Sequence, residues 1–321
     1  MEPDTLDLAS LPGASVMMRA ARQVTLRAPL GRYRLSAGLA RMARRRFRGW
    51  FPTAAGVASF CCDLQDAIAR EVWFTGGYEP QEAALLAALL QPGMTFVDAG
   101  ANWGYFSLLG AALVGSGGRL LSFEPDPRLA MLLRSNLRAC GRETSARETA
   151  LAEAPGASRL AGFAAAQDNH GLSRLVADAA PGPDCFTVRT EALDQVLDDL
   201  HIEHVDLVKM DIEGGEALAL QGMRRGLAQR RYRRILLEVH PALLTEQGRR
   251  VADVIEPLLA AGYRAWRIDH SQAVTRRAAY RRNFTWLQAL RPFAPEDALD
   301  LWPHLLWLAP GISLPGAASD L

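Results

Sequence analysis

The stretch TFVDAGANWGYFS, residues 95–107, decides the fold. Its apolar beginning predicts a β-strand that ends on Asp98, and the loop that follows contains Gly100 and Gly104 before a helical pattern begins. In α/β proteins, a strand, a glycine-containing turn and a helix present a nucleotide-sized ligand to backbone amides and to the positive end of the helix. We therefore predict a ligand-binding loop at residues 98–104.

The same loop argues against two common ligand classes. It has neither the Gly-Lys-Ser/Thr ending of a phosphate-binding loop nor the Gly-x-Gly-x-x-Gly spacing of a dinucleotide site, which disfavours a nicotinamide oxidoreductase. A carboxylate at Asp98 favours a ligand that is cationic or rich in amine and hydroxyl donors. S-adenosylmethionine carries a sulfonium and an ammonium group, and we predict it as the cofactor.

Strand and helix patterns alternate after this loop. Strands are predicted at residues 119–124, 205–211 and 233–240, with two late strands at 263–269 and 301–310. A helix begins at Asp126 and Pro127 and stops at Gly141. This alternation predicts an α/β fold with a mostly parallel sheet that is covered on both faces.

Polar residues end four of the predicted strands. They are Asp98, Glu124, Asp211 and the pair Glu238 and His240. Ligands bind outside the carboxyl ends of the strands in such sheets, so these side chains are the candidate site. Glu124 lies one strand–helix–strand step after Asp98, where a carboxylate can accept hydrogen bonds from both ribose hydroxyls.

The glycines of the loop have a predicted role of their own. Gly100 and Gly104 would let the backbone approach the methionine part of the cofactor closely, because a Cβ atom at either position would collide with the ligand or with the first helical turn.

The stretch KMDIEGGEALALQGM, residues 209–223, brings three acids to a helix start. Capping and dipole compensation explain Asp211, Glu213 and Glu216 in part, because a helix N-terminus favours acids. Asp211 also ends an apolar strand, and two glycines open space beside it. We therefore predict functional roles for Asp211 and Glu213.

In LLEVH, residues 236–240, Glu238 and His240 face the same side of a strand. His240 could be the general base for a hydroxyl nucleophile, since its ordinary pKa lies near working pH. Alternatively, Asp211, Glu238 and His240 could hold a divalent metal such as Mg²⁺ that acidifies the hydroxyl. A third explanation is a structural histidine with a backbone partner.

The first 71 residues differ from the rest of the chain. Residues 17–52 contain ten arginines and no acid, and LSAGLARMARRRF, residues 35–47, predicts an amphipathic helix with Leu35, Leu39 and Phe47 on its apolar face. We predict an Arg-rich N-terminal extension at 1–71 and a catalytic domain at 72–321. Packing on that domain or on a second subunit is the simplest role for the extension. Peripheral membrane contact through residues 17–52 stays open, and no nucleic-acid partner is expected.

Composition places the protein in a reducing compartment. The four cysteines lack metal-ligand spacing, and a chain of 321 residues does not need disulfides to fold. The acidic N-terminus does not resemble a signal peptide, and no uncharged stretch approaches the length of a membrane span. A cytoplasmic location is therefore expected.

Five motifs together resemble one family. They are PGMTFVDAGANWGYFS (92–107), FEPDP (123–127), LDQVL (193–197), DLVKMDIEGGEALALQGM (206–223) and ILLEVHP (235–241). In this order and spacing they resemble the FkbM-type S-adenosylmethionine-dependent methyltransferases, over roughly residues 72–245 and more weakly through LWLAP (306–310).

The resemblance implies a class I, Rossmann-like methyltransferase fold whose seven-stranded sheet has an antiparallel last strand. It places at the cofactor the residues Asp98, Gly100, Ala101, Asn102, Gly104, Glu124 and Asp211. It also assigns Asp211, Glu213 and Glu216 to an acidic motif and leaves the catalytic base open.

The favoured function is O-methylation of a sugar or secondary-metabolite hydroxyl, free or carrier-bound, by in-line displacement from S-adenosylmethionine. One alternative is N-methylation of a small amine or peptide, which needs less help from a base. An alternative of another class is a non-catalytic methyltransferase-like scaffold that binds anionic partners through its basic N-terminal segment.

Overall fold

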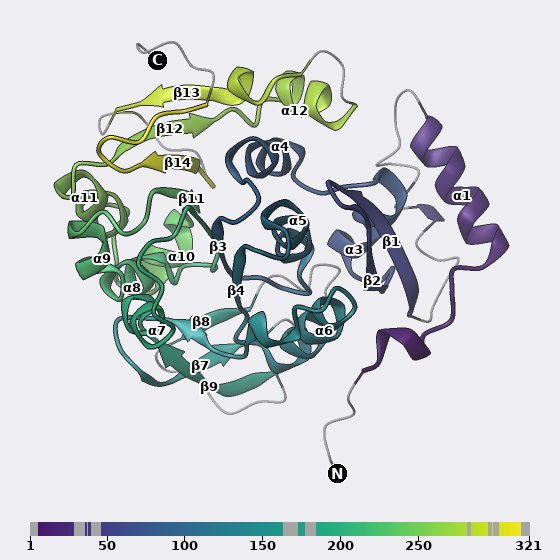
Figure 1. The fold of residues 1–321 in the computed structure, drawn as a ribbon, viewed down its shortest axis with the longest axis horizontal. Helices are drawn as coiled ribbons and strands as arrows, with labels where there is room; N and C mark the ends of the chain where they lie inside the picture. Colours follow the sequence, from purple (N-terminus) through teal and green to yellow (C-terminus); the bar gives the residue numbers. More distant parts are fainter. Residues whose placement is uncertain are drawn as a thin grey trace.

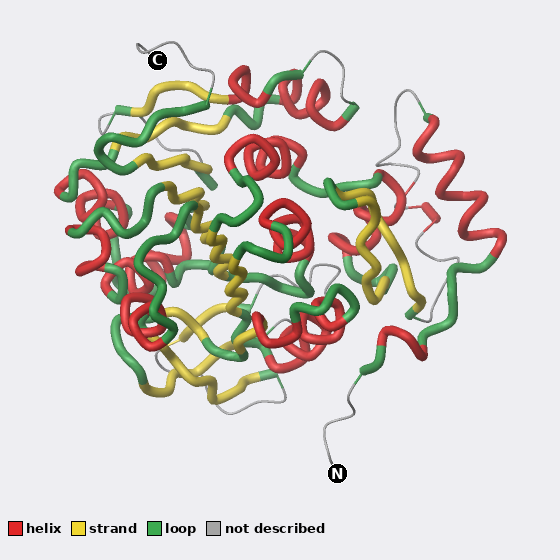
Figure 2. Tube along the Cα trace, viewed as in Figure 1, coloured by secondary structure: helices red, strands yellow, loops and turns green. Residues whose placement is uncertain are grey.

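An eight-stranded sheet forms the centre of the molecule (Figures 1 and 2). The structure is a computed structural model that describes residues 6–28, 36, 38–39, 46–162, 173–176, 184–280, 284–294, 297 and 302–315. The strand order is β13-β12-β14-β11-β10-β3-β4-β5. The strands are β3 (Thr95–Ala99), β4 (Arg119–Phe123), β5 (Ala146–Arg147), β10 (Leu207–Met210), β11 (Arg234–Glu238), β12 (Arg264–Ile268), β13 (Leu290–Phe293) and β14 (His304–Leu308).

Strand directions confirm the predicted class I fold. Strands β5, β4, β3, β10 and β11 run parallel, and β14 inserts antiparallel between β11 and β12. The prediction of seven strands is wrong by one, because β13 adds an antiparallel edge strand beside β12. Its sequence, LRPF, is short and contains a proline, which is tolerated at a sheet edge but weakens any strand pattern.

Helices cover both faces of the sheet (Figure 1). One face carries α4 (Pro80–Leu89), α5 (Tyr105–Val114) and α6 (Pro127–Arg138), and α12 (Gln272–Ala279) packs on α4. The other carries α7 (Leu193–Asp199), α8 (Glu216–Gln221), α9 (Arg224–Ala228), α10 (Pro241–Glu246) and α11 (Ala252–Ala260). Successive strand residues alternate between the faces: Phe96 joins the first core and Val97 the second. No helix in the described ranges is long and apolar enough to cross a membrane.

A smaller four-stranded sheet lies beside the main one, at the bottom of Figure 1. Its order is β6-β9-β7-β8. The strands are β6 (Ala150–Leu151), β7 (Gly156–Ala161), β8 (Arg174–Val176) and β9 (Cys185–Glu191). Leu160 and Leu175 from this sheet are buried and help to line the cavity described below.

The N-terminal segment forms a helix and a hairpin. It contains the short 3-10 helix η1 (Leu8–Ser10), α1 (Val16–Arg27), β1 (Phe47–Thr53), β2 (Gly56–Cys62) and α3 (Ala67–Thr75). Two further 3-10 helices, η3 (Glu143–Ser145) and η4 (Trp286–Ala289), lie later in the chain. The predicted helix at 35–47 is wrong at Phe47, which begins β1; residues 29–35, 37 and 40–45 lie outside the described residues.

Arg22 shows that one arginine of the basic segment is structural. Its side chain is 1% exposed, and its guanidinium lies 4.1 Å from the Trp50 ring centroid and 4.5 Å from that of Trp73. It also donates a hydrogen bond to the Trp73 carbonyl. These contacts fasten α1 to the hairpin and to α3. The division at residues 71 and 72, and contacts of the extension with a membrane or a second subunit, stay predictions.

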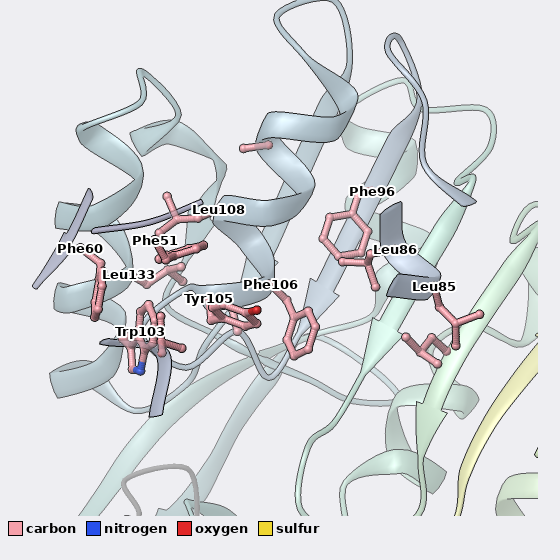
Figure 3. Packing of buried hydrophobic residues seen from close by; sticks show 14 of the residues in the cluster. Phe51, Phe60, Leu85, Leu86, Phe96, Trp103, Tyr105, Phe106, Leu108 and Leu133 are labelled. Atoms are coloured by element: carbon pink, nitrogen blue, oxygen red, sulfur yellow. The ribbon is translucent and has the colours of Figure 1, made fainter. Parts of the chain in front are cut away.

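The hairpin packs on the segment that follows β3. Phe60 stacks on Trp103 with ring centroids 4.8 Å apart, and Phe51 packs on Tyr105 at 5.1 Å (Figure 3). Trp103 Nε1 donates to Asp66 Oδ2 at 3.1 Å, and the Asn136 amide donates to the Trp103 carbonyl at 2.7 Å. The N-terminal segment and α6 therefore both contact and support the loop after β3.

Candidate functional site

A cavity opens at the carboxyl ends of β3, β4 and β10. The predicted site residues that line it are Gly100, Ala101, Asn102, Glu124, Asp211 and Glu213. Lining residues that the sequence did not single out for the site include Tyr78, Phe106, Thr149, Leu151 and Lys209. Among the described residues, the cavity walls do not include four predicted site residues, which lie behind or beside the cavity: Asp98, Gly104, Glu238 and His240.

The two loop glycines are required by the protein itself. Gly100 has φ +80°, and a Cβ atom there would overlap the backbone carbonyl of Asp211. Gly104 is the N-cap of α5 with φ +100°, and its Cβ atom would lie 2.8 Å from Leu133 Cδ1. The predicted reason, a collision with the ligand or the first helical turn, is thus corrected: the glycines let β3 approach β10 and let α5 approach α6.

Glu124 is a buried carboxylate that faces the cavity. Its Oε2 accepts from the Asn102 N–H at 2.8 Å, and its Oε1 accepts from the Asp126 N–H at 2.9 Å. Burial raises the pKa of Glu124 to about 8, because the loss of water outweighs these two hydrogen bonds. Each carboxylate oxygen has a second lone pair, so Glu124 can still accept from two hydroxyl groups.

Asp98 lies one layer behind the cavity wall. Its side chain is fully buried, and its Oδ2 accepts from Ser107 Oγ at 2.6 Å, while Ser107 also meets Ser122 at 2.8 Å. Burial raises the pKa of Asp98. Its Oδ1 has no hydrogen-bond partner among the described residues. Asp98 thus contacts α5 through Ser107, and its direct contact with the cofactor stays a prediction.

Asp211 and Glu213 form the acidic wall of the cavity. Asp211 Oδ2 lies 3.2 Å from Lys209 Nζ. Burial alone would raise the pKa of Asp211, but the charges of Lys209 and His240 hold it below its ordinary value. Glu213 lacks a cation this close, and burial raises its pKa to about 7. One wall of the cavity thus carries an ionised carboxylate and a second one that titrates near neutral pH.

His240 is held by a buried carboxylate. Its Nδ1 lies 2.7 Å from Glu216 Oε1, and its Nε2 lies 3.5 Å from Glu213 Oε2, 3.5 Å from Glu238 Oε1 and 3.8 Å from Asp211 Oδ1. Burial would lower its pKa, but the Glu216 hydrogen bond and the nearby carboxylates raise it to about 9. A protonated imidazole cannot accept a proton, so the structure opposes the prediction of His240 as general base at neutral pH. The predicted backbone partner is also wrong, since the partner is a carboxylate.

The predicted metal set, Asp211, Glu238 and His240, meets only in part. Asp211 and His240 converge with Glu213, whereas Glu238 converges with Asp211 and Glu79, and the ligand atoms within each set lie within 4.8 Å of one another. Glu79, the N-cap of α4, was not predicted as a site residue, because it precedes β3 and lies far in the sequence from Asp211 and Glu238.

A third cluster joins Glu82, His270 and His304. Glu82 Oε1 lies 2.7 Å from His270 Nε2 and 3.1 Å from His304 Nδ1. These are direct hydrogen-bonding distances, and they tie α4 to the end of β12 and to β14.

Comparison with protein families gives one match. Residues 98–265, just over half of the chain, match the family model described as the methyltransferase FkbM domain. This range contains every predicted site residue.

Similar proteins include the AMB antimetabolite synthetase AmbE of Pseudomonas aeruginosa, which is 27% identical over 184 residues. That match covers 47% of this chain and 9% of the synthetase, so the chain corresponds to a small part of that protein. A solved S-adenosylmethionine-dependent O-methyltransferase from Thermotoga maritima has a TM-score of 0.37 at 14% identity, over 83% of this chain and 78% of that one. Aeropyrum pernix fibrillarin with bound S-adenosylmethionine has a TM-score of 0.36 at 14% identity, over 71% of this chain and 73% of that one.

Proposed function

The chain belongs to the FkbM family of S-adenosylmethionine-dependent methyltransferases, and we propose that it methylates a hydroxyl group of a small-molecule acceptor. The observation that carries the proposal is the cavity itself, where Glu124 and the Gly100 loop face Asp211 and Glu213 across one space. The first pair suits the adenosine and methionine parts of the cofactor, and the second pair suits an acceptor with a proton to lose.

The lining residues of the cavity offer partners for each part of the cofactor. Thr149, Ala150 and Leu151 offer an apolar wall for the adenine, and Glu124 offers acceptors for the ribose hydroxyls. The backbone of Gly100 to Asn102 borders the place of the methionine part. Bound S-adenosylmethionine supplies a methyl group activated by the sulfonium charge.

The chain's own contribution to transfer is positioning and charge. Asp211 and Glu213 would touch the acceptor, because both line the cavity. Glu213, with a pKa of about 7, is the proton acceptor that we propose when no cation occupies this wall. His240 would act as a positioning residue, since its charge holds the carboxylates of Asp211 and Glu213 together from behind.

The acceptor class rests on supporting observations. A secondary metabolite or sugar, free or carrier-bound, agrees with the similarity to part of an antimetabolite synthetase. N-methylation of an amine is the second candidate, because the carboxylates of Asp211 and Glu213 would attract a protonated amine. A cytoplasmic location belongs to the same proposal and agrees with four cysteines that are free of disulfides.

Calorimetric titration tests the cofactor assignment. We expect the metal-stripped protein to bind S-adenosylmethionine and S-adenosylhomocysteine in the micromolar range and to show no heat with NAD. A panel of hydroxyl and amine acceptors, read by mass spectrometry for the gain of one methyl group, then separates O- from N-methylation. If folded protein binds neither adenosyl compound, the non-catalytic scaffold becomes the favoured function.

The pKa of Glu124 predicts a pH dependence of cofactor binding. Ribose hydroxyls donate to the ionised carboxylate, and a pKa of about 8 leaves Glu124 largely protonated at pH 6. We expect the Kd for S-adenosylmethionine to fall as pH rises from 6 to 8, approaching tenfold per pH unit, and to level off above that. Glu124→Gln cannot ionise and should bind weakly with a flat profile. A flat profile in the wild type would show that the two backbone N–H groups already keep Glu124 ionised.

A further inference from the structure

The surroundings of His240 Nε2 point to a bound cation. The side chain is 3% exposed, and its only hydrogen bond to the described residues joins Nδ1 to Glu216. Nε2 instead faces three carboxylates at 3.5–3.8 Å. From this geometry we propose that Asp211, Glu213 and His240 Nε2 hold one divalent metal ion at the wall of the cavity.

The distance between the imidazole nitrogen and a carboxylate oxygen distinguishes two ligands of one metal ion from a direct hydrogen bond. A hydrogen-bonded imidazole and carboxylate approach to about 2.7–2.9 Å, as His240 Nδ1 and Glu216 do. Two ligands that lie about 2.1 Å from one metal ion are instead about 3.0–3.5 Å apart. The distance of 3.5 Å from Nε2 to Glu213 lies at the upper end of this range, and the 3.8 Å to Asp211 lies just beyond it; both are longer than direct pairing. The Glu82 cluster follows the first pattern, so we assign no ion to it.

Glu216 completes the arrangement from behind. Its side chain is fully buried, and its Oε1 receives both the Gly214 N–H at 3.0 Å and His240 Nδ1 at 2.7 Å. The carboxylate on Nδ1 keeps a proton on that nitrogen. A metal ion would therefore displace the proton from Nε2 and bind its lone pair, which is directed toward Asp211 and Glu213. Metal-binding histidines are usually oriented in this way.

The site would be open on the cavity side. Asp211 and Glu213 line the cavity, whereas His240 lies behind them, so the remaining coordination positions face the acceptor. Open positions are typical of catalytic metal sites, where an ion lowers the pKa of a bound hydroxyl. Two carboxylates and one imidazole suit Mn²⁺ or Zn²⁺ better than Mg²⁺, which prefers oxygen ligands. The metal therefore deepens the proposed function and rests on it.

Titration with Mn²⁺ tests the site without an activity measurement. Metal-stripped protein is titrated with Mn²⁺, and free ion is followed by electron paramagnetic resonance. We expect one Mn²⁺ per chain in the wild type and a loss of affinity of at least about tenfold in His240→Gln and in Glu213→Gln. Glu216→Gln, which keeps all three ligands, should weaken binding by about 10–100-fold. Glu203→Gln, at an exposed acid that precedes β10, is the matched control and should bind as the wild type does.

The outcomes separate this inference from the function on which it rests. Binding of S-adenosylmethionine by wild-type protein that takes up no Mn²⁺ would overturn the metal site and leave the acidic wall to a cationic acceptor. Equal Mn²⁺ affinity in the wild type and in both ligand variants would overturn it as well. Loss of S-adenosylmethionine binding in the wild type would instead refute the proposed function. Melting curves of each variant show whether weak binding reflects a misfolded chain.

Discussion

Glu124→Ala is expected to weaken binding of S-adenosylmethionine by about 100-fold or more. The carboxylate would accept both ribose hydroxyls, and hydrogen bonds to a charged group contribute about 1.5–3 kcal/mol each. Loss of two such bonds corresponds to at least about 3 kcal/mol, or two powers of ten in Kd. The same change leaves the N–H groups of Asn102 and Asp126 without their acceptor, which loosens the loop. Isothermal calorimetry above pH 8, where Glu124 is ionised, measures the effect.

Two controls make this result specific. Glu148→Ala removes an acid whose side chain is 40% exposed and should leave affinity unchanged. Thermal melting of the unliganded variant shows whether the fold survives. A folded Glu124→Ala protein with wild-type affinity would mean that the ribose lies elsewhere in the cavity.

Gly100→Ala should destabilise the protein more than any other addition of one methyl group at this site. The residue has φ +80°, which L residues rarely adopt, and the new Cβ would overlap the carbonyl oxygen of Asp211. Both β3 and β10 lie in the centre of the sheet, so neither backbone can move away without breaking the ladder between them. We expect the free energy of unfolding to fall by about 4 kcal/mol or more, as measured from the shift of the urea midpoint.

Gly93→Ala is the matched control for the backbone effect. Gly93 has φ +89° but no atom within 4 Å of its Cβ position, and it is exposed. In Gly93→Ala, only the strain of a left-handed residue should lower the free energy of unfolding, by about 1–2 kcal/mol. Equal losses at the two positions would show that the strands separate easily, and the close approach of β3 and β10 would then not be what requires Gly100.

Local patterns predicted the frame of the site. Apolar strands that end on Glu124 and Asp211 can be recognised in sequence, because parallel strands bring their carboxyl ends to one edge. The loop between Asp98 and Gly104 was found in the same way. Even so, the side chain of Asp98 proved to face Ser107, because one residue of register decides whether a strand-terminal side chain meets the cavity or the adjacent helix.

Contacts between distant segments could not be predicted. Glu79 reaches Asp211 and Glu238 from a helix that precedes the first strand of the main sheet, and no spacing rule links these positions. The pKa of His240 depends on Glu216. From the sequence, the position of Glu216 was explained in part by the helix dipole. Of the smaller sheet, the sequence predicts the strand that begins at Cys185, which is β9. Strands β6 and β8 are only two and three residues long, and their register comes from pairing with β9 and β7.

The stack of Phe60 on Trp103 makes the wall of the cavity depend on the N-terminal segment. Trp103 lies in the wall of the cavity, and the two residues described above that contact its indole ring, Phe60 and Asp66, both belong to the first 71 residues. A fragment that starts at residue 72 would keep every cofactor ligand and lose the platform beneath them.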